Sequence, residues 1–256
     1  MDMNRKIYIT IIAVFAVILS VSTFILVRNY FDSAKQTEQY QELAEAVEEN
    51  DTEETAEPDK DDTTILPEYA ELYKQNTDMV GWVKIDGTKL NYPVMQSVDE
   101  PNFYLKHGFD KKYTDYGCPY VQENCDVSAP SDNLVLYGHH MNDGSMFAVL
   151  DKYKKEAFWK EHKTIQFDTL TQRNEYEIVA AFTTVVYTES PESFRYYHFT
   201  EAGSKEEFDE YIAKCKELSF YDTGVTAEYG DKLITLSTCE YSRTNGRIVV
   251  VAKLMK

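Results

Sequence analysis

The C-terminal stretch Asp231-Lys-Leu-Ile-Thr-Leu-Ser-Thr-Cys239-Glu-Tyr-Ser-Arg-Thr-Asn-Gly-Arg247-Ile-Val-Val-Val-Ala-Lys253 contains two runs of β-branched and aliphatic residues. Residues 233–238 and 248–252 are typical of strands, and the Asn-Gly pair between them is typical of a turn. The stretch therefore predicts an antiparallel hairpin, with Cys239 at the end of its first strand and Arg247 at the start of its second. A thiol and a guanidinium would then face each other at one end of a sheet, where a rigid scaffold commonly holds functional side chains.

Bulk composition describes a globular chain with an acidic segment. The chain has 256 residues, is 43% hydrophobic and carries a formal net charge of −18. That charge argues against nucleic-acid binding, which needs clustered Lys and Arg. Residues 38–62 contain twelve acidic residues and one basic one, so this stretch alone carries −11 of the −18. The acidity therefore describes a linker more than a binding surface.

The N-terminal residues 7–27 carry no charge and are long enough to cross a bilayer as a helix. A cleaved signal peptide is the alternative, but signal cores are usually only ~7–15 residues long. We expect an uncleaved anchor at 7–27, with residues 1–6 in the cytoplasm because they include Arg5 and Lys6. Residues 28–65 would form an acidic stalk, and residues 66–256 a folded domain outside the cell.

The folded domain begins with a short helix near Pro67, a residue that suits the first helical turn. Short strands with turn signals follow and favour a barrel or a sandwich. Besides the hairpin, the predicted strands are 79–85, 89–95, 133–137, 164–167 and 176–187. The predicted helices are 145–154, which breaks and resumes near 156–162, and 204–218, where Ser204 and Glu207 form a capping box.

The four cysteines show neither zinc spacing nor a Cys-x-x-Cys motif. Cys118 and Cys125 are close enough in sequence to pair if a turn allows it. Cys215 falls on the apolar face of a predicted helix, which indicates core packing. Cys239 is then the thiol that lies beside polar, turn-forming neighbours.

Two adjacent histidines, His139 and His140, follow a predicted strand and a glycine. A histidine at such a strand exit can project into a cleft. Adjacent residues point to different sides, so at most one of the pair faces Cys239. The pair lacks the spacing of helical zinc ligands and has no patterned carboxylate companion, so metal binding is not favoured.

A cysteine, a histidine and an arginine on three separate strand ends favour nucleophilic acyl chemistry. The thiolate of Cys239 attacks, an imidazole transfers protons, and Arg247 offers a planar fork of charged donors to a developing oxyanion. The plain alternative is that Cys239 is a small buried hydrophobe and Arg247 a surface charge.

The motif Thr235-Leu236-Ser237-Thr238-Cys239, followed eight residues later by Arg247, resembles the Thr-Leu-x-Thr-Cys signature of sortases. Three further stretches resemble class B sortases: DMVGWVKIDGT (78–88) with NYPVMQ (91–96), YGHHM (137–141) with DGSMF (143–147), and IVVVAK (248–253). The resemblance covers about residues 66–256. It implies a mainly β fold, a closed eight-stranded barrel with N-terminal helices and a helix before the penultimate strand, preceded by one transmembrane helix.

The resemblance also implies an activity, that of a cysteine transpeptidase in Gram-positive cell-wall anchoring. Such an enzyme cleaves a C-terminal sorting motif, NPQTN-like or PxTG-like, after its Thr and transfers the surface protein to an amino group of a peptidoglycan precursor. No metal or organic cofactor is required. The runner-up is a pilin-polymerising class B-like enzyme that uses a pilin Lys as acceptor. A different class is a non-catalytic, membrane-anchored surface protein.

Carried over residue by residue, the resemblance implies that Cys239 is the nucleophile, His139 the general acid/base and Arg247 the group that binds the oxyanion or positions substrate. Class B relatives commonly have Asn after the catalytic histidine, where this chain has His140. We expect His139 to be the acting imidazole. Thr238, Ser237 and His140 are candidate supporting or substrate-binding residues.

Overall fold

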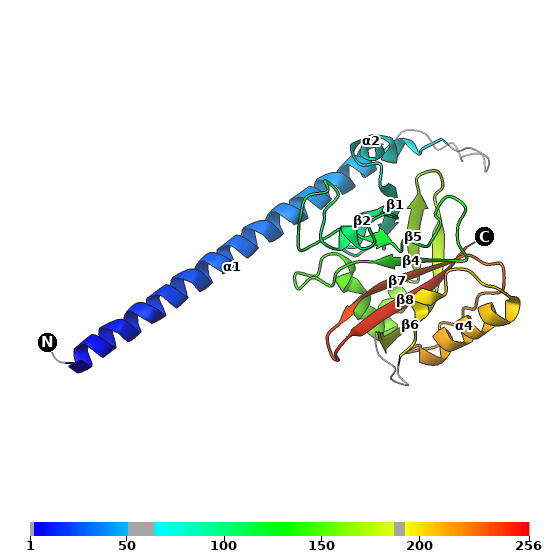
Figure 1. The fold of residues 1–256 in the computed structure, drawn as a ribbon. Helices are drawn as coiled ribbons and strands as arrows, with labels where there is room; N and C mark the ends of the chain where they lie inside the picture. The colour runs from blue at the N-terminus through cyan, green and yellow to red at the C-terminus, as the bar shows by residue number, and fades with distance from the viewer. Residues whose placement is uncertain (1–2, 51–63, 187–192, 256) are drawn as a thin grey trace. The chain divides into compact units, whose positions relative to one another are not determined.

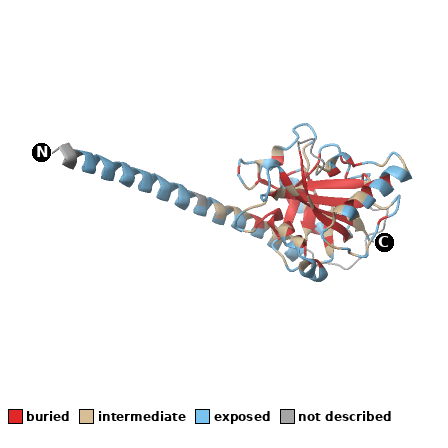
Figure 2. Ribbon diagram, turned by 90° about the horizontal axis from the view of Figure 1, so that it is seen from below, coloured by how far each residue is buried: buried red, intermediate tan, exposed pale blue. Residues whose placement is uncertain are grey.

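The computed structural model describes residues 3–50, 64–186 and 193–255. It divides into a helical unit that ends at Glu42 and a second unit from Leu43 to the C-terminus. Helix α1 (Met3–Asn50) runs unbroken through the apolar stretch and on into the acidic one. In the described ranges it is the one helix long and apolar enough to cross a membrane, and the apolar side chains of residues 7–27 are exposed (Figure 2). Residues 1–2 and 51–63, within the predicted cytoplasmic segment and stalk, lie outside the described residues.

The second unit contains a closed barrel of eight strands in the order β1-β2-β3-β4-β7-β8-β6-β5 (Figure 1). The strands are β1 (Met79–Lys84), β2 (Asn91–Met95), β3 (Tyr120–Val121), β4 (Asn133–Tyr137), β5 (Thr164–Thr169), β6 (Glu175–Val185), β7 (Leu233–Glu240) and β8 (Gly246–Leu254). The predicted eight-stranded closed barrel is thus confirmed. Residue 187, the predicted end of β6, lies outside the described residues.

Strands β4 and β7 form the part of the barrel that positions the site. They run parallel, with Tyr137 opposite Ser237, and β8 pairs antiparallel with the other side of β7. Nearly every residue of β7 is buried. A strand covered on both faces takes mainly apolar side chains, as Leu233, Ile234 and Leu236 show. Strand β3 has only two residues, too few for any pattern, and the sequence did not predict it.

Helices surround the barrel. They are α2 (Pro67–Gln75), η1 (Phe103–Leu105), η2 (Phe147–Lys154), α3 (Glu156–Glu161), η3 (Tyr196–His198) and α4 (Lys205–Leu218). The N-terminal helix α2 and the helix α4 before the penultimate strand are where they were expected. Ser204 caps α4 by accepting a hydrogen bond from the Glu207 N–H, while the Glu207 carboxylate accepts one from the Gly203 N–H. Segment η2, predicted as an ordinary helix, is a 3-10 helix.

The cysteines outside β7 are free thiols in the interior. Cys118 and Cys125 do not pair with each other. The Cys118 Sγ lies 3.5 Å from the Pro93 carbonyl oxygen, and the Cys125 Sγ lies 3.5 Å from that of Asn133. Cys215 is fully buried on α4, as its place on the apolar face predicts. None of these three thiols shares the surroundings of Cys239, which is partly exposed.

Candidate active site

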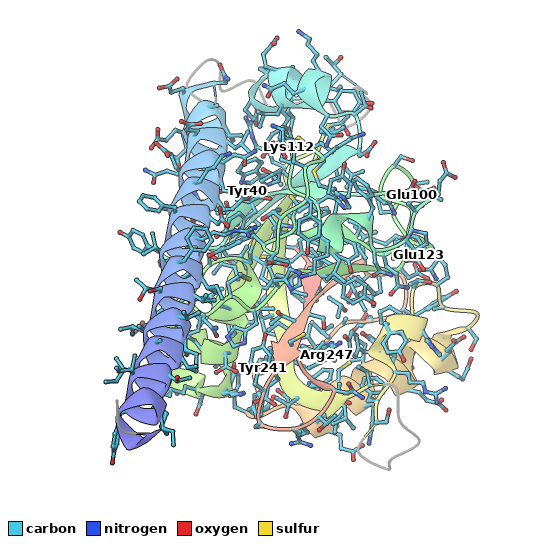
Figure 3. The ribbon with its side chains drawn as sticks, turned by 60° about the vertical axis from the view of Figure 1, so that its left-hand side comes forward. Tyr40, Glu100, Lys112, Glu123, Tyr241 and Arg247 are labelled. Carbon is cyan, nitrogen blue, oxygen red and sulfur yellow. The ribbon has the colours of Figure 1, made fainter. Side chains whose placement is uncertain are left out.

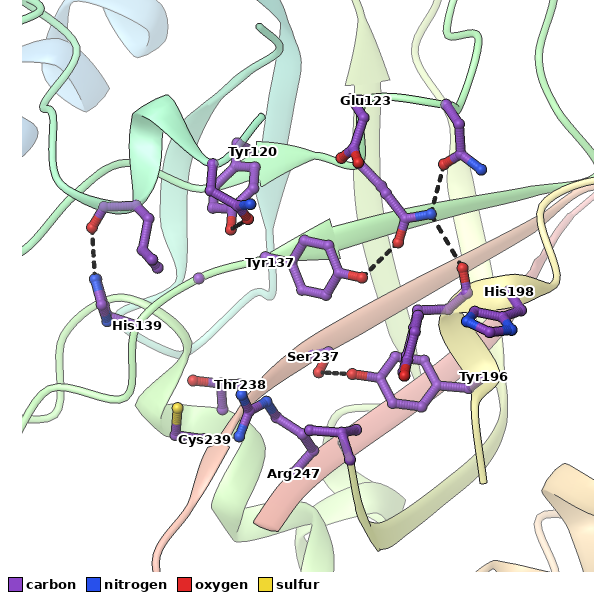
Figure 4. Close-up of a pocket in the computed structure, with 17 residues that line it drawn as sticks. Tyr120, Glu123, Tyr137, His139, Tyr196, His198, Ser237, Thr238, Cys239 and Arg247 are labelled. Carbon is purple, nitrogen blue, oxygen red and sulfur yellow. Dashed lines mark hydrogen bonds between the residues drawn. The ribbon is translucent and has the colours of Figure 1, made fainter. Parts of the chain in front are cut away.

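The β7–β8 hairpin brings the predicted thiol and guanidinium together. Cys239 and Arg247 are direct partners in the antiparallel ladder. Side chains of directly opposed residues project from the same face, with Cβ atoms about 4.5–5.5 Å apart. Both residues line one cavity, and the guanidinium lies beside Thr238 and Cys239 (Figure 4). The register therefore confirms the arrangement that the hairpin pattern predicts.

The turn of the hairpin needs its Asn-Gly pair. Asn245 has a φ of 56°, in the left-handed region that Asn tolerates better than most residues. At Gly246, a Cβ atom would lie only 2.5 Å from the Glu240 carbonyl oxygen. The chain can close tightly here because Gly246 has no side chain. Its carbonyl oxygen also accepts a hydrogen bond of 2.8 Å from Arg247 Nη1, which orients the guanidinium.

Glu240, the residue after Cys239, anchors the hairpin to its surroundings. Its buried carboxylate lies 2.8 Å from Lys154 Nζ on η2 and accepts a hydrogen bond of 2.7 Å from the Ser242 hydroxyl. Burial alone would raise the pKa of Glu240, but the hydrogen bonds from Lys154 and Ser242 outweigh it and hold this pKa below its usual value. The negative charge of Glu240 is thus neutralised by an ion pair within the fold.

His139 lies in the turn after β4 and lines the same cavity as Cys239. Its Nε2 lies 2.7 Å from the Leu105 carbonyl oxygen. Since a carbonyl only accepts, Nε2 carries the proton, and Nδ1 holds the free lone pair of the neutral ring. In the described chain no hydrogen bond joins His139 to the Cys239 thiol. The turn itself depends on Gly138, where a Cβ atom would lie 2.6 Å from the Phe147 ring.

The surroundings of His139 favour its neutral form. Burial lowers the pKa of its half-buried imidazole, and the positive charge of Lys106 lowers it further. The hydrogen bond to the Leu105 carbonyl and the negative charge of Asp115 act in the opposite direction, but the net pKa lies below the usual value. A neutral imidazole in the cavity can accept a proton, which is the requirement for a general base near neutral pH.

His140 takes a different position from its neighbour and does not line the cavity. Its ring stacks on that of Tyr241, with centroids 5.2 Å apart and an interplanar angle of 16°. The Tyr241 hydroxyl donates a hydrogen bond of 3.2 Å to the His140 carbonyl oxygen. Tyr241, like Arg247, lies at the end of the hairpin (Figure 3). The structure therefore brings His139, and not His140, into the cavity with Cys239.

The two supporting candidates on β7 are both buried and both line the cavity. The Ser237 hydroxyl lies 2.6 Å from the Tyr196 hydroxyl, so it ties η3 to the strand. The Thr238 Oγ1 is buried and has no hydrogen-bond partner among the described residues. Thr238 therefore presents an unused donor and acceptor beside the thiol.

The cavity has a volume of about 830 Å³ and extends well beyond the predicted residues. Sequence reasoning missed the wall formed by Gln122, Glu123 and Asn124, which follows the two-residue strand β3. It also missed Tyr137, although that residue ends a predicted strand directly before the Gly-His-His turn, a signal that could have identified it. In the described ranges, no group of three or more His, Cys, Asp or Glu residues is placed to hold a metal ion.

Comparison with known proteins gives one consistent result. The family model described as Sortase domain matches residues 83–255. Sortase B of Staphylococcus aureus is 30% identical over 257 residues, 99% of each chain, and sortase B of Listeria monocytogenes is 35% identical over 193 residues, 75% of each chain. A Staphylococcus aureus sortase B-substrate complex superimposes with a TM-score of 0.77 at 29% identity, covering 88% of this chain and 99% of that one. The chain belongs to the sortase family as a class B sortase, a cysteine transpeptidase.

Proposed function

We propose that this enzyme cleaves a C-terminal sorting motif, NPQTN-like or PxTG-like, after its Thr and transfers the new carboxyl end to an amino group of a peptidoglycan precursor. The observation that carries the proposal is the direct pairing of Cys239 with Arg247 at the mouth of a cavity that His139 also lines. The similarity to a sortase B-substrate complex supports a substrate-binding role for this fold.

In the first half-reaction, neutral His139 takes the proton of the Cys239 thiol, and the resulting thiolate attacks the carbonyl carbon of the motif's Thr. The Arg247 guanidinium donates hydrogen bonds to the developing oxyanion, for which its planar fork of donors is suited. His139 gives a proton to the departing amide nitrogen, and the C–N bond breaks. The products are a thioester on Cys239 and a free amine at the start of the C-terminal fragment.

In the second half-reaction, the acceptor amine attacks the thioester carbonyl. His139 takes the proton that the amine loses, the C–S bond breaks, and Cys239 returns as a thiolate. The hydrogen bond of His139 to Leu105 does not conflict with this role, because catalytic contacts in substrate-free enzymes are often long and tighten only when substrate binds.

The N-terminal helix supports a placement of the enzyme in the membrane. We assign residues 7–27 as the anchor, with residues 1–6 in the cytoplasm, residues 28–65 as the stalk and residues 66–256 outside the cell. The long, apolar and exposed α1 supports the anchor, and the basic residues before it support the orientation. Sorting-signal-bearing surface proteins and the peptidoglycan amine would then meet the enzyme on the same side.

The test is thioester capture by the full-length chain in detergent. A library of sorting-motif peptides is added, and intact-mass spectrometry follows the protein. We expect an acyl adduct on Cys239 and a released C-terminal fragment in the wild type, no adduct in Cys239→Ala, and an adduct in the control Cys118→Ala, whose thiol is buried elsewhere. An adduct in Cys239→Ala, or none in the wild type with any peptide, would contradict the proposal.

The acceptor is tested in the same reaction by adding amines to the acyl-enzyme. Resolution by the side-chain amine of a peptidoglycan stem peptide, or by an oligoglycine attached to it, is the expected result. Faster resolution by a Lys in a folded pilin subunit would instead assign the enzyme to pilus assembly.

A further inference from the structure

One wall of the cavity is built from polar side chains that satisfy each other. The Gln122 side-chain amide accepts a hydrogen bond from the Tyr137 hydroxyl and donates to the Asn124 side chain and, at 3.0 Å, to the Tyr197 carbonyl oxygen (Figure 4). These groups are therefore engaged within the protein. They form a fixed surface and leave little hydrogen-bonding capacity for a ligand.

Glu123, next to Gln122, is the exception on this wall. It is the acidic residue among those that line the cavity, it is exposed, and its carboxylate makes no ion pair or hydrogen bond with any described residue. By contrast, the carboxylate of Glu240 beside Cys239 is occupied by Lys154. An acidic group on the wall of a peptide-binding cavity is open to a cation that the substrate brings.

The distance of Glu123 from the thiol follows from the strand register. The Gln122 N–H bonds to the Val135 carbonyl, Val135 lies opposite Thr235, and Thr235 precedes Cys239 by four residues. Glu123 lies one residue beyond Gln122, so five residues along the strand direction and two strand spacings separate it from Cys239. At roughly 3.3 Å per residue and about 4.8 Å between strands, this separation is roughly 19 Å. Figure 4 shows Glu123 at the opposite end of the cavity from Cys239.

An extended peptide covers roughly 19 Å in about six residue steps. When the scissile Thr lies at Cys239 and the residues before it run toward Glu123, about the seventh residue, counting that Thr as the first, reaches Glu123. In a motif whose conserved part is four residues up to Thr, this is the third residue before the motif.

Two negative charges act at this end of the cavity. Burial raises the pKa of the Cys125 thiol behind the wall to about 11, and the charges of Glu201 and Glu123 raise it as well. The guanidinium of Arg247 stands at the other end, far enough away for solvent to screen most of its interaction with Glu123. The cavity thus has a cationic end at the reacting bond and an anionic end upstream of it.

We propose that Glu123 is a specificity-determining residue that selects a cationic side chain, Lys or Arg, at the third residue before the sorting motif. The proposal rests on the proposed function, because it names a feature of the peptide that this cavity receives. Exposed ion pairs are worth little, so the expected preference for Lys over an uncharged residue is about two- to fivefold in kcat/KM. The contact lies far from the reacting atoms, so the change falls on KM rather than on kcat.

The experiment uses the full-length chain and three peptides that share a cleaved motif and differ only in the third residue before it: Lys, Gln or Glu. The wild type is expected to cleave them in the order Lys, Gln, Glu. Glu123→Gln is expected to remove the differences, and Glu123→Lys to reverse the order. Glu100→Gln is the matched control, since Glu100 is exposed but does not line the cavity, and it should behave as the wild type does (Figure 3).

High salt gives a second readout. At ~1 M ionic strength, charges more than about 3 Å apart are largely screened, so the preference of the wild type for the Lys peptide should decrease. Equal cleavage of the three peptides by the wild type, or an unchanged preference in Glu123→Gln, would overturn the assignment of Glu123. Failure of the wild type to cleave any motif peptide is a different result, which would remove the proposed function and this inference with it.

Discussion

The two sides of the active site are held in place by different means. Cys239 and Arg247 are opposite partners in a regular ladder, and β8 is paired on both of its sides, with Arg247 opposite Cys239 in β7 and opposite Thr184 in β6. His139 lies in an irregular turn. Its carbonyl oxygen accepts one backbone hydrogen bond, of 2.9 Å, from Phe147, and its imidazole bonds to Leu105, 34 residues away in sequence.

This difference assigns different tasks to the two sides. A doubly paired strand holds its side chains in a nearly fixed geometry, which suits groups that must meet an oxyanion with the right distance and angle. A turn outside the regular ladder can shift its side chain at lower cost. In the proposed mechanism the imidazole serves a leaving amine in one half-reaction and an arriving amine in the other, which suits the adjustable side.

The largest effect is expected in the turn after β4, where the two adjacent histidines can be replaced by Ala one at a time. His139→Ala should lower kcat/KM by about 10³-fold, within the range for loss of a general acid/base. His140→Ala should lower it by less than about tenfold, because His140 stacks on Tyr241 outside the cavity. The measurement is peptide cleavage, with thermal unfolding of both variants as the control for folding. An inactive His140→Ala beside an active His139→Ala would contradict the assignment.

In the β7–β8 ladder, Arg247→Lys tests whether catalysis needs the planar guanidinium of Arg247 or only its positive charge. Lys keeps the positive charge but loses the planar fork of donors, so we expect kcat to fall by about 10²-fold, the size of losing one oxyanion donor. Arg243→Lys in the same loop is the matched control and should retain near wild-type turnover, since Arg243 does not line the cavity. Near-normal turnover of Arg247→Lys would refute the bidentate role of the guanidinium.

The sequence predicts the pairing of Cys239 with Arg247 but not the contacts of His139, for a physical reason. Within the hairpin, the apolar runs, the Asn-Gly turn and the short loop determine the register, so the pairing of Cys239 with Arg247 follows from local pattern alone. The acceptor for His139 is a carbonyl on η1, and no local pattern connects Leu105 with residue 139. The strand β3 and the Gln122–Asn124 wall escaped prediction because two residues cannot show alternation.

A similar ambiguity explains why the sequence predicts an ordinary helix where η2 is a 3-10 helix. Met146, Phe147, Val149 and Leu150 are all buried, as predicted. Apolar residues spaced three apart satisfy both an α-helix and a 3-10 helix, so burial could be predicted for 145–154 while the hydrogen-bond pattern could not.

The smallest expected effect concerns the electrostatics of the turn. Because burial lowers the pKa of His139, its titration midpoint, followed by NMR in the Cys239→Ala protein, should lie below the usual value of about 6.5. In the unfolded chain His139 binds a proton more readily than in the folded protein. The stability contributed by neutral His139 is therefore present above about pH 6.5 and is lost as pH falls through the folded-state pKa.

Lys106 and Asp115 form an ion pair of 2.8 Å beside His139 and shift its pKa in opposite directions. Lys106→Gln should therefore raise the midpoint, Asp115→Asn should lower it, and the double variant should fall between them. Shifts of the same sign in both single variants would show that the turn rearranges when either charge is removed, and the field of this ion pair would then not explain the titration of His139.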